Sequence, residues 1–357
     1  MKRSPASFAA FVAVVSLAPF GAGCDRRPAL VPASADSTAA GVDSFTVHAR
    51  QALDAWDAGD DATAATASAR VTREALEARP NAPWPERARG VLDSLGIGAE
   101  VTGNDRATVV NLFSRMRGEG DSWPWLFWRE GGAVRSQALE ARGWQLSDLA
   151  ARGMTEASEP TDSAQIAVLW NRRVGAGGQP QLTVWRHATG GRWDLVQTLG
   201  PDSLGGVGSG EFEGDDTTTT LTTRTFRTTP YFDECGTCPH VFQERLFDWG
   251  PGGFTRIGTH PVPSPYSTFT AFVNALIAND RTAAIEQVVD PSLVDFARKF
   301  EWNVPSKGRW RVAPATDESA IEMVFFRGQK DAFRVTFEAR DGDWVIAGFE
   351  PTSRAVE

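Results

Sequence analysis

The chain of 357 residues carries 45 acidic and 36 basic side chains, a net charge of −9 at pH 7. This acidity, with the arginines scattered along the chain, excludes the basic footprint of a nucleic-acid-binding protein. The length predicts two or three domains, and a hydrophobic content of 41% is ordinary for a chain with globular cores.

Residues 1–23 have the layout of a secretory signal peptide. Lys2 and Arg3 precede an apolar run of 13 residues at positions 8–20, whereas a membrane-spanning helix needs roughly 20. The small residues of "GAGC" then lead to Cys24. This arrangement resembles the signal of bacterial lipoproteins, which is cut before a cysteine that becomes acylated. Gly21 stands where that family most often has Leu, so ordinary cleavage stays open as an alternative.

The resemblance implies that acyl chains on Cys24 anchor the protein to a bacterial cell membrane, facing the periplasm or the exterior. The inner and the outer membrane both stay open. Residues 24–44 are rich in Pro, Ala and Ser, which predicts a flexible tether after the lipidated cysteine. Removing the signal leaves 34 basic and 45 acidic residues, so the mature chain is more acidic still.

Residues 45–104 predict a helical region. Apolar side chains recur at helical spacing from Phe45 to Trp56, and Gly59 ends this first helix. An Ala-rich second helix stops at Pro80, and Pro85 opens a third.

Residues 105–262 predict an antiparallel β-rich domain. An apolar strand that carries a Trp and leads into a Gly-Gly loop recurs at 126–132, 168–178, 183–191 and 246–253. Each of these segments predicts a hairpin. The Trp residues are 42, 15 and 64 positions apart, whereas a propeller has a steady period. An irregular assembly of sheets is therefore the first interpretation, and a partial propeller is the second. A sandwich is also open.

Residues 263–357 predict an α+β domain. Ser264 can cap a helix with Pro265 at its first position, and Asp280 can cap a second. Strands are predicted at 309–313, 319–327, 331–340 and 343–350. Helices followed by a curved antiparallel sheet resemble the NTF2-like, cystatin-type α+β cone, a family with both enzymes and binding modules. The predicted class is therefore α+β: a helical N-terminal cap, an antiparallel β-rich middle region and a C-terminal NTF2-like cone.

The stretch "DECGTCPH", residues 233–240, carries the clearest chemistry. Haem attachment of the c type requires His directly after the second Cys, but Pro239 intervenes here. Pro239 also disfavours helical angles at Cys238, and a thioredoxin-like centre needs a cysteine at a helix N-terminus. Haem is therefore excluded, and redox catalysis is disfavoured.

A disulfide is the preferred interpretation of these cysteines. If Cys24 is acylated, Cys235 and Cys238 are the two that remain, and neighbouring cysteines in an oxidising compartment pair. The alternative is a metal or redox protein in which Cys235, Cys238 and His240 supply three ligands. Asp233 or His260 would then be the fourth. No cofactor is predicted.

The sequence contains few of the motifs by which enzyme classes are recognised. The motifs of zinc proteases, P-loop NTPases and α/β-hydrolases are absent, and no histidine lies in the C-terminal domain. We therefore predict a non-catalytic binding or assembly module of the cell envelope, whose partner is an envelope protein or a small apolar ligand. The alternative is a small-molecule enzyme that uses Glu322 or Glu338 in the cone. The Trp-rich stretch 123–128 is the candidate for a sugar-stacking platform, although buried strand Trp is the commoner outcome.

Overall fold

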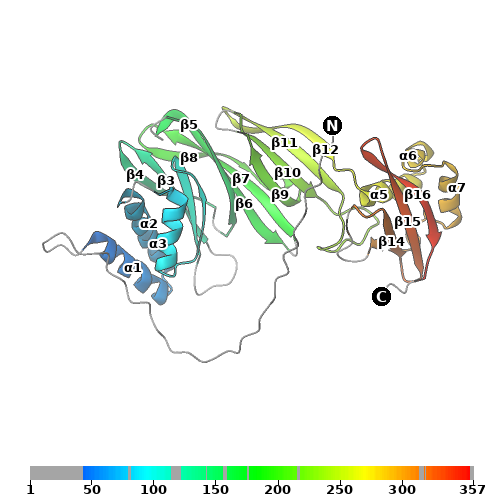
Figure 1. The fold of residues 1–357 in the computed structure, drawn as a ribbon, viewed down its shortest axis with the longest axis horizontal. Helices are drawn as coiled ribbons and strands as arrows, with labels where there is room; N and C mark the ends of the chain where they lie inside the picture. Colours follow the sequence, from blue (N-terminus) through cyan, green and yellow to red (C-terminus); the bar gives the residue numbers. More distant parts are fainter. Residues whose placement is uncertain are drawn as a thin grey trace, which may run out of the picture. The chain divides into compact units, whose positions relative to one another are not determined.

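The computed structural model describes residues 43–78, 82–113, 122–141, 143–155, 159–174, 177–214, 218–312, 317 and 319–353. All of them belong to the compact unit Val42–Glu357. Within these residues the chain is mostly antiparallel β, with four four-stranded sheets whose strands are ordered as in the chain (Figure 1). Over the same residues, no helix has the length and apolar character needed to cross a bilayer.

The N-terminal helices are α1 (Ser44–Ala58), α2 (Asp61–Ala78) and α3 (Trp84–Ser94). Sheet 1 contains β1 (Ala99–Gly103), β2 (Ala107–Phe113), β3 (Ser122–Glu130) and β4 (Ala133–Ala138). Sheet 2 contains β5 (Gln145–Met154), β6 (Pro160–Val174), β7 (Gly177–Ala188) and β8 (Arg192–Leu199). The short helix α4 (Pro201–Leu204) leads to sheet 3, with β9 (Val207–Glu213), β10 (Thr220–Phe226), β11 (Phe242–Gly250) and β12 (Gly253–Pro261).

The rest of the described chain, called here the C-terminal module, runs from α5 to β16. Its helices are α5 (Pro265–Ile277), α6 (Arg281–Glu286) and α7 (Ser292–Lys299), and a 3₁₀ turn spans Pro305–Lys307. Sheet 4 contains β13 (Trp310–Val312), β14 (Glu322–Arg327), β15 (Asp331–Arg340) and β16 (Asp343–Pro351).

The fold class predicted from the sequence was wrong. The described chain is a mostly antiparallel β protein of four meandering sheets, not a helical cap, a β-rich middle and an NTF2-like α+β cone. The error has a physical source. Periodicity reports which face of a helix or strand is buried, but it does not report which element covers that face. The individual helices and strands were predicted well, whereas their assembly was not. The domain boundaries stay predictions.

The N-terminal helices share their core with sheet 1. Their buried faces pack with Val110 and Leu112 of β2 and with Phe127 of β3. Trp56 of α1 is 1% exposed and donates from Nε1 to Ser68 Oγ of α2 at 3.1 Å. The apolar stripes of the helices therefore cover one face of a sheet.

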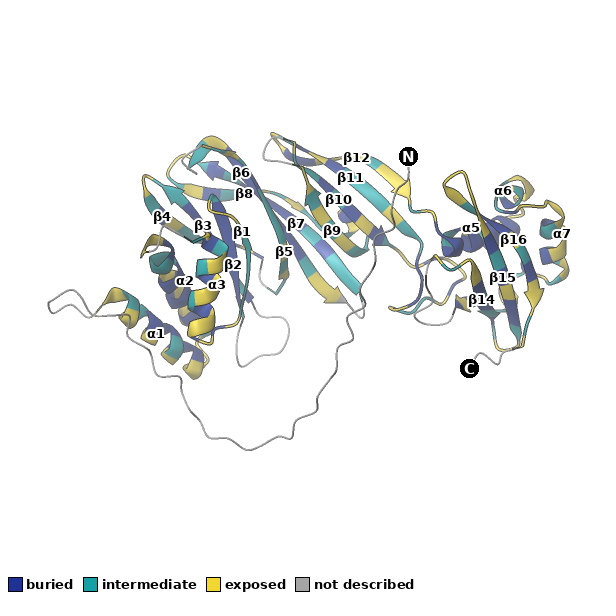
Figure 2. Ribbon diagram, viewed as in Figure 1, coloured by how far each residue is buried: buried dark blue, intermediate teal, exposed yellow. Residues whose placement is uncertain are grey.

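Sheet 2 is apolar on both faces, and β6 shows why. Along this strand Ile166, Val168 and Trp170 pack into a core shared with sheet 1. The alternate residues Ala167 and Leu169 pack into a core shared with sheet 3. Because side chains alternate along a strand, a strand buried on both faces is a continuous apolar run. Figure 2 shows the buried residues, in dark blue, along β6 and β7.

The Gly-Gly segments form hairpins, as the sequence predicts. They connect β3 to β4, β7 to β8 and β11 to β12. β6 also pairs antiparallel with β7, where Gly177 and Gly178 are the first two strand residues. In the first of them Gly131 and Gly132 have φ angles of 60° and 77°, which glycine adopts at little cost.

Two glutamines join the last strands of successive sheets. Gln137 on β4 donates to the Trp193 carbonyl on β8 at 2.6 Å and accepts from the Trp193 N–H at 2.9 Å. In the same way, Gln197 on β8 donates to the Phe254 carbonyl on β12 at 2.8 Å and accepts from its N–H at 2.7 Å. Each glutamine thus satisfies both backbone groups of one edge-strand residue.

The C-terminal module begins as predicted. The Ser264 side chain accepts from the Ser267 N–H at 3.0 Å, and α5 starts at Pro265. Its core holds Phe269, 0% exposed, with the ring stacked on Phe325 at a centroid distance of 3.6 Å. The module is therefore filled by aromatic side chains.

Candidate functional site

The connection between β10 and β11, residues 227–241, is here called the docking loop. Its Phe232 is 1% exposed and belongs to the aromatic core of the C-terminal module. The backbone pairs with the edge strand β13: the Asp233 N–H donates to the Trp310 carbonyl at 2.7 Å, and the Trp310 N–H donates to the Tyr231 carbonyl at 2.9 Å. Sheet 4 is thus extended by a segment that comes from sheet 3.

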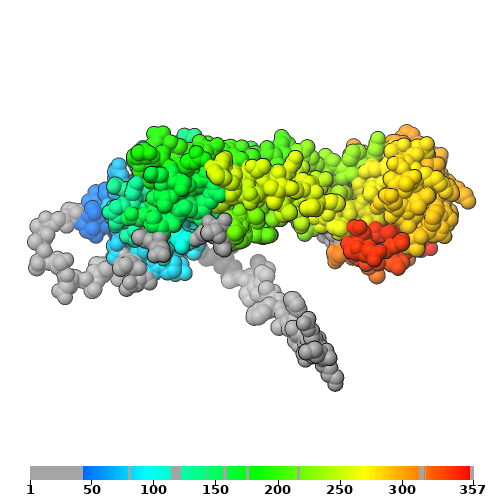
Figure 3. Space-filling view, turned by 90° about the horizontal axis from the view of Figure 1, so that it is seen from above, coloured from blue at the N-terminus to red at the C-terminus, as the bar shows by residue number. Residues whose placement is uncertain are grey.

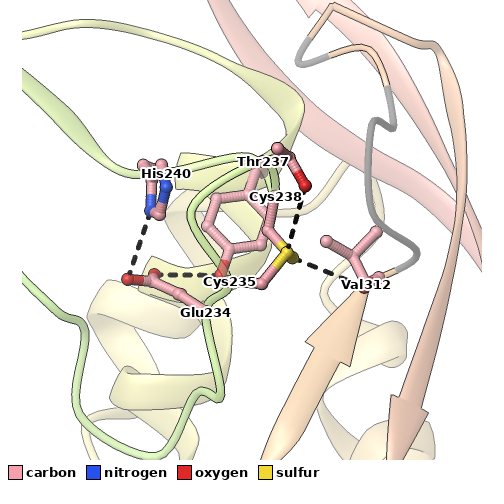
Figure 4. The surroundings of a disulfide bond; sticks show 7 residues. Glu234, Cys235, Thr237, Cys238, His240 and Val312 are labelled. Atoms are coloured by element: carbon pink, nitrogen blue, oxygen red, sulfur yellow. Dashed lines mark hydrogen bonds and ion pairs between the residues drawn. A yellow bond between two sulfur atoms is a disulfide. The ribbon is translucent and has the colours of Figure 1, made fainter. Parts of the chain in front are cut away.

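Cys235 and Cys238 form a disulfide within the docking loop, as predicted, with their Cα atoms 5.0 Å apart. Cys238 is 8% exposed and packs in the module core, and its Sγ lies 4.0 Å from the Val312 carbonyl (Figure 4). Cys235 is partly exposed. The bond closes the turn that carries the loop into the module.

A buried carboxylate lies beside the disulfide. The side chain of Glu234 is 2% exposed. Its Oε1 accepts from the Tyr266 hydroxyl at 3.0 Å, and its Oε2 accepts from the Thr229 N–H at 3.3 Å. His240 Nδ1 lies 3.5 Å from Oε2, which is long for a hydrogen bond, so we treat it as an electrostatic contact (Figure 4). Three residues, two from the docking loop and one from α5, thus converge on one carboxylate.

These contacts perturb two ionisable groups in opposite directions. Burial opposes ionisation of Glu234, but the contacts from His240, Thr229 and Tyr266 outweigh it and hold the pKa of the carboxyl below its usual value. Burial and then the charge of Glu234 raise the pKa of the Tyr266 phenol far above its usual value. At neutral pH the cluster is therefore a carboxylate with a neutral phenol as donor.

The imidazole of His240 is held by aromatic contacts. It stacks on Phe226 with ring centroids 3.6 Å apart and an interplanar angle of 8°. The residue is 6% exposed, and its Nε2 has no hydrogen-bond partner among the described residues. The ring is therefore positioned by packing and is shielded from solvent.

The disulfide is arranged as a structural cross-link rather than as a reactive centre. A thiol attacking the more accessible sulfur, at Cys235, would expel the Cys238 thiolate into an apolar core, and a poorly solvated thiolate is a poor leaving group. Bonded to one another, the two sulfurs are not thiolate ligands for zinc. Across the described residues, no group of three or more His, Cys, Asp or Glu side chains has the geometry of a metal site.

The acids proposed for catalysis lie in solvent. Glu322 on β14 is 52% exposed and lies 3.3 Å from Arg334 Nε. Glu338 on β15 is also exposed. Neither is the buried acid that the enzymatic alternative requires.

The other predicted residues are placed as follows. Trp123 and Trp125 pack with Phe127 against the N-terminal helices, so this Trp-rich stretch contributes to a core and not to an open platform. His260 on β12 is exposed and has no part in the disulfide cluster. Cys24 lies outside the described residues.

Sequence reasoning missed Glu234 and Tyr266 as partners. Glu234 stands next to a cysteine, but nothing in its neighbourhood indicates burial. Tyr266 lies on α5, 32 positions further along the chain. The available signal was Tyr266 itself, because a buried tyrosine needs an acceptor for its hydroxyl.

Comparisons with known proteins identify no family for this chain. No family model matches it, and no curated protein matches it. Among solved structures, the rhamnogalacturonan lyase YesW is similar over 73% of this chain, with 11% identity and a TM-score of 0.20. The chain covers 53% of that enzyme, about half its length. A likeness at this level carries no argument about fold or function.

Proposed function

We propose that this chain is an exported bacterial lipoprotein, attached to the cell membrane by acyl chains on Cys24. It acts as a non-catalytic binding or assembly module of the cell envelope. The observation that carries the proposal is the Cys235–Cys238 disulfide, because such bonds persist in oxidising compartments and are rare in the cytosol. The signal-like N-terminus is the second support.

The proposal that the protein is not a catalyst is supported by the surroundings of three acidic side chains. The buried carboxylate, Glu234, is occupied by Tyr266 and Thr229 and shielded by packing. The acids first suspected, Glu322 and Glu338, lie in solvent. A general acid or base has to reach a substrate proton in a site that positions both groups. Glu234 is shielded from a substrate, and Glu322 and Glu338 lie in open solvent.

The anchor is tested in the native host by metabolic labelling with a fatty acid. The wild-type protein is expected to incorporate label and to partition into detergent with the membrane fraction. The Cys24→Ala variant is expected to lose both properties, and Cys235→Ala is the matched control that keeps them. An unlabelled wild-type protein, or one found in the cytosolic fraction, would overturn the proposal.

A further inference from the structure

Two arginines meet at the end of α4. Arg245 on β11 donates from Nη1 to the Ser203 carbonyl at 3.1 Å and to the Asp202 carbonyl at 3.5 Å. Arg227, directly after β10, donates from Nη2 to the Asp202 carbonyl at 3.2 Å. Both guanidinium groups are thus held in place by backbone acceptors of one short helix.

Arg245 approaches α4 closely because the residue directly after this helix is a glycine. Gly205 has a φ of 118°, and a Cβ there would lie 3.1 Å from Arg245 Nε and 2.0 Å from Thr225 Oγ1. Nε itself is buried and has no hydrogen-bond partner among the described residues. The close approach therefore leaves Nε packed against the glycine rather than open to solvent.

A third arginine lies on the same face of sheet 3. Arg256 on β12 is opposite Phe247, which is two residues after Arg245 on β11, so Arg256 and Arg245 are diagonal neighbours. A β-bulge lies between Leu246 and Phe247, and the charge of Arg256 still acts on Arg245 across it. Arg256 is exposed, and Figure 3 shows the yellow-green β11–β12 region at the surface.

The positive charge at this site is not balanced. Burial, and then the charges of Arg256 and Arg227, lower the pKa of Arg245 from its usual value. Asp202 Oδ1 lies 3.5 Å from Arg227, but both side chains are exposed, which leaves the pair weak. In the described part of the chain, Arg245 and Arg256 have no ion pair. This excess of cations stands out on an acidic protein.

We infer that Arg227, Arg245 and Arg256 form a binding site for a phosphate group. One arginine fork satisfies a carboxylate, whereas a cluster of three guanidinium groups suits a tetrahedral anion with several oxygens. Two of the three are already held by α4, so little side-chain entropy is lost on binding. The phosphate can be a free ion or the headgroup of an anionic lipid, and the site does not depend on the anchor at Cys24.

The test uses the full chain carrying Cys24→Ala, so that no acyl chain contributes. Inorganic phosphate is titrated by calorimetry at constant ionic strength set with chloride. Saturable one-site binding is expected, and Arg256→Gln is expected to weaken it about tenfold, the effect of losing one charge-assisted contact. Arg340→Gln removes an exposed strand arginine elsewhere and is expected to leave affinity unchanged.

A second arm separates the two sources of phosphate. Binding to phosphatidylglycerol vesicles that inorganic phosphate competes away, and that Arg256→Gln weakens, assigns the site to a lipid headgroup. Binding of inorganic phosphate without binding to vesicles assigns it to the free ion. The inference is overturned if neither probe shows saturable binding, or if Arg256→Gln and Arg340→Gln behave alike.

Discussion

Sheets 1–3 and the C-terminal module build their contacts in different ways. Where successive sheets meet, apolar faces form shared cores, and Gln137 and Gln197 bridge the edge strands. The C-terminal module instead takes Phe232 from a loop of sheet 3, next to a buried carboxylate and a disulfide. The sheet contacts repeat one scheme along the chain, whereas the module depends on a single local arrangement. Substitutions should therefore act differently in the two regions.

The largest expected effect is in the aromatic core of the C-terminal module. Phe269→Ala removes a fully buried ring that stacks on Phe325 and should cost about 3–5 kcal/mol of unfolding free energy. Leu169→Ala, in the core between sheets 2 and 3, should cost about 2–5 kcal/mol. Urea unfolding followed by tryptophan fluorescence measures both. A loss below about 1 kcal/mol for Phe269→Ala would contradict the packing described for the module.

The next effect is at the buried carboxylate. Glu234→Gln should cost about 1.5–3 kcal/mol at pH 7, because the amide offers only one, uncharged acceptor to the Tyr266 hydroxyl and the Thr229 N–H. The exposed Glu322→Gln is the control, expected within about 0.5 kcal/mol of wild type.

The stability loss caused by Glu234→Gln depends on pH, and the sign of this dependence follows from the lowered pKa of Glu234. The unfolded carboxyl protonates near its ordinary pKa of about 4.3, while the folded one protonates at lower pH. Its stabilisation is therefore present above about pH 4.3 and is lost as the pH falls through the folded pKa. The difference between wild type and Glu234→Gln should shrink from pH 7 to pH 3. A difference that grows on acidification would refute this account.

A smaller effect is expected where glutamine joins two sheets. Gln197→Leu leaves the Phe254 N–H and carbonyl without their partners and should cost about 1–3 kcal/mol. Gln137→Leu should behave alike, and the double variant should show additive losses because the two contacts share no residue. Denaturant titration of the four proteins tests this, with Gln243→Leu on β11 as an exposed control.

The smallest effect is expected from removing the disulfide. Its loop spans a sequence separation of 3, so it restricts the unfolded chain little. The double variant Cys235→Ala, Cys238→Ala should lose about 2 kcal/mol or less. Thermal unfolding of the oxidised wild type and the variant measures the loss. Failure of the variant to fold would mean that the bond, rather than Phe232, holds the docking loop.

Local signals in the sequence predicted local structure. Gly-Gly located the hairpins, and Ser264 located the start of α5. In each case the residue type acts on its own backbone or on groups within a few positions. The pairing of Cys235 with Cys238 was also within reach, because the two are neighbours in the chain.

Long-range contacts could not be predicted in this way. Phe232 pairs with Trp310 across nearly 80 positions, and no sequence feature near either residue indicates the other as its partner. Arg227, Arg245 and Arg256 look scattered in the chain, and they converge only because β10, β11 and β12 are neighbours in sheet 3. Single-sequence patterns report burial and turns, but the choice of partner depends on which faces meet. The wrong fold class has the same origin.

The most direct measurement for the central claim is differential alkylation of the protein isolated from its own host. The protein is treated with one alkylating reagent under native conditions, then reduced, treated with a second and analysed by mass spectrometry. Cys235 and Cys238 should both carry the second reagent only, as expected for an exported chain whose sulfurs are bonded. Labelling of both by the first reagent would contradict the account.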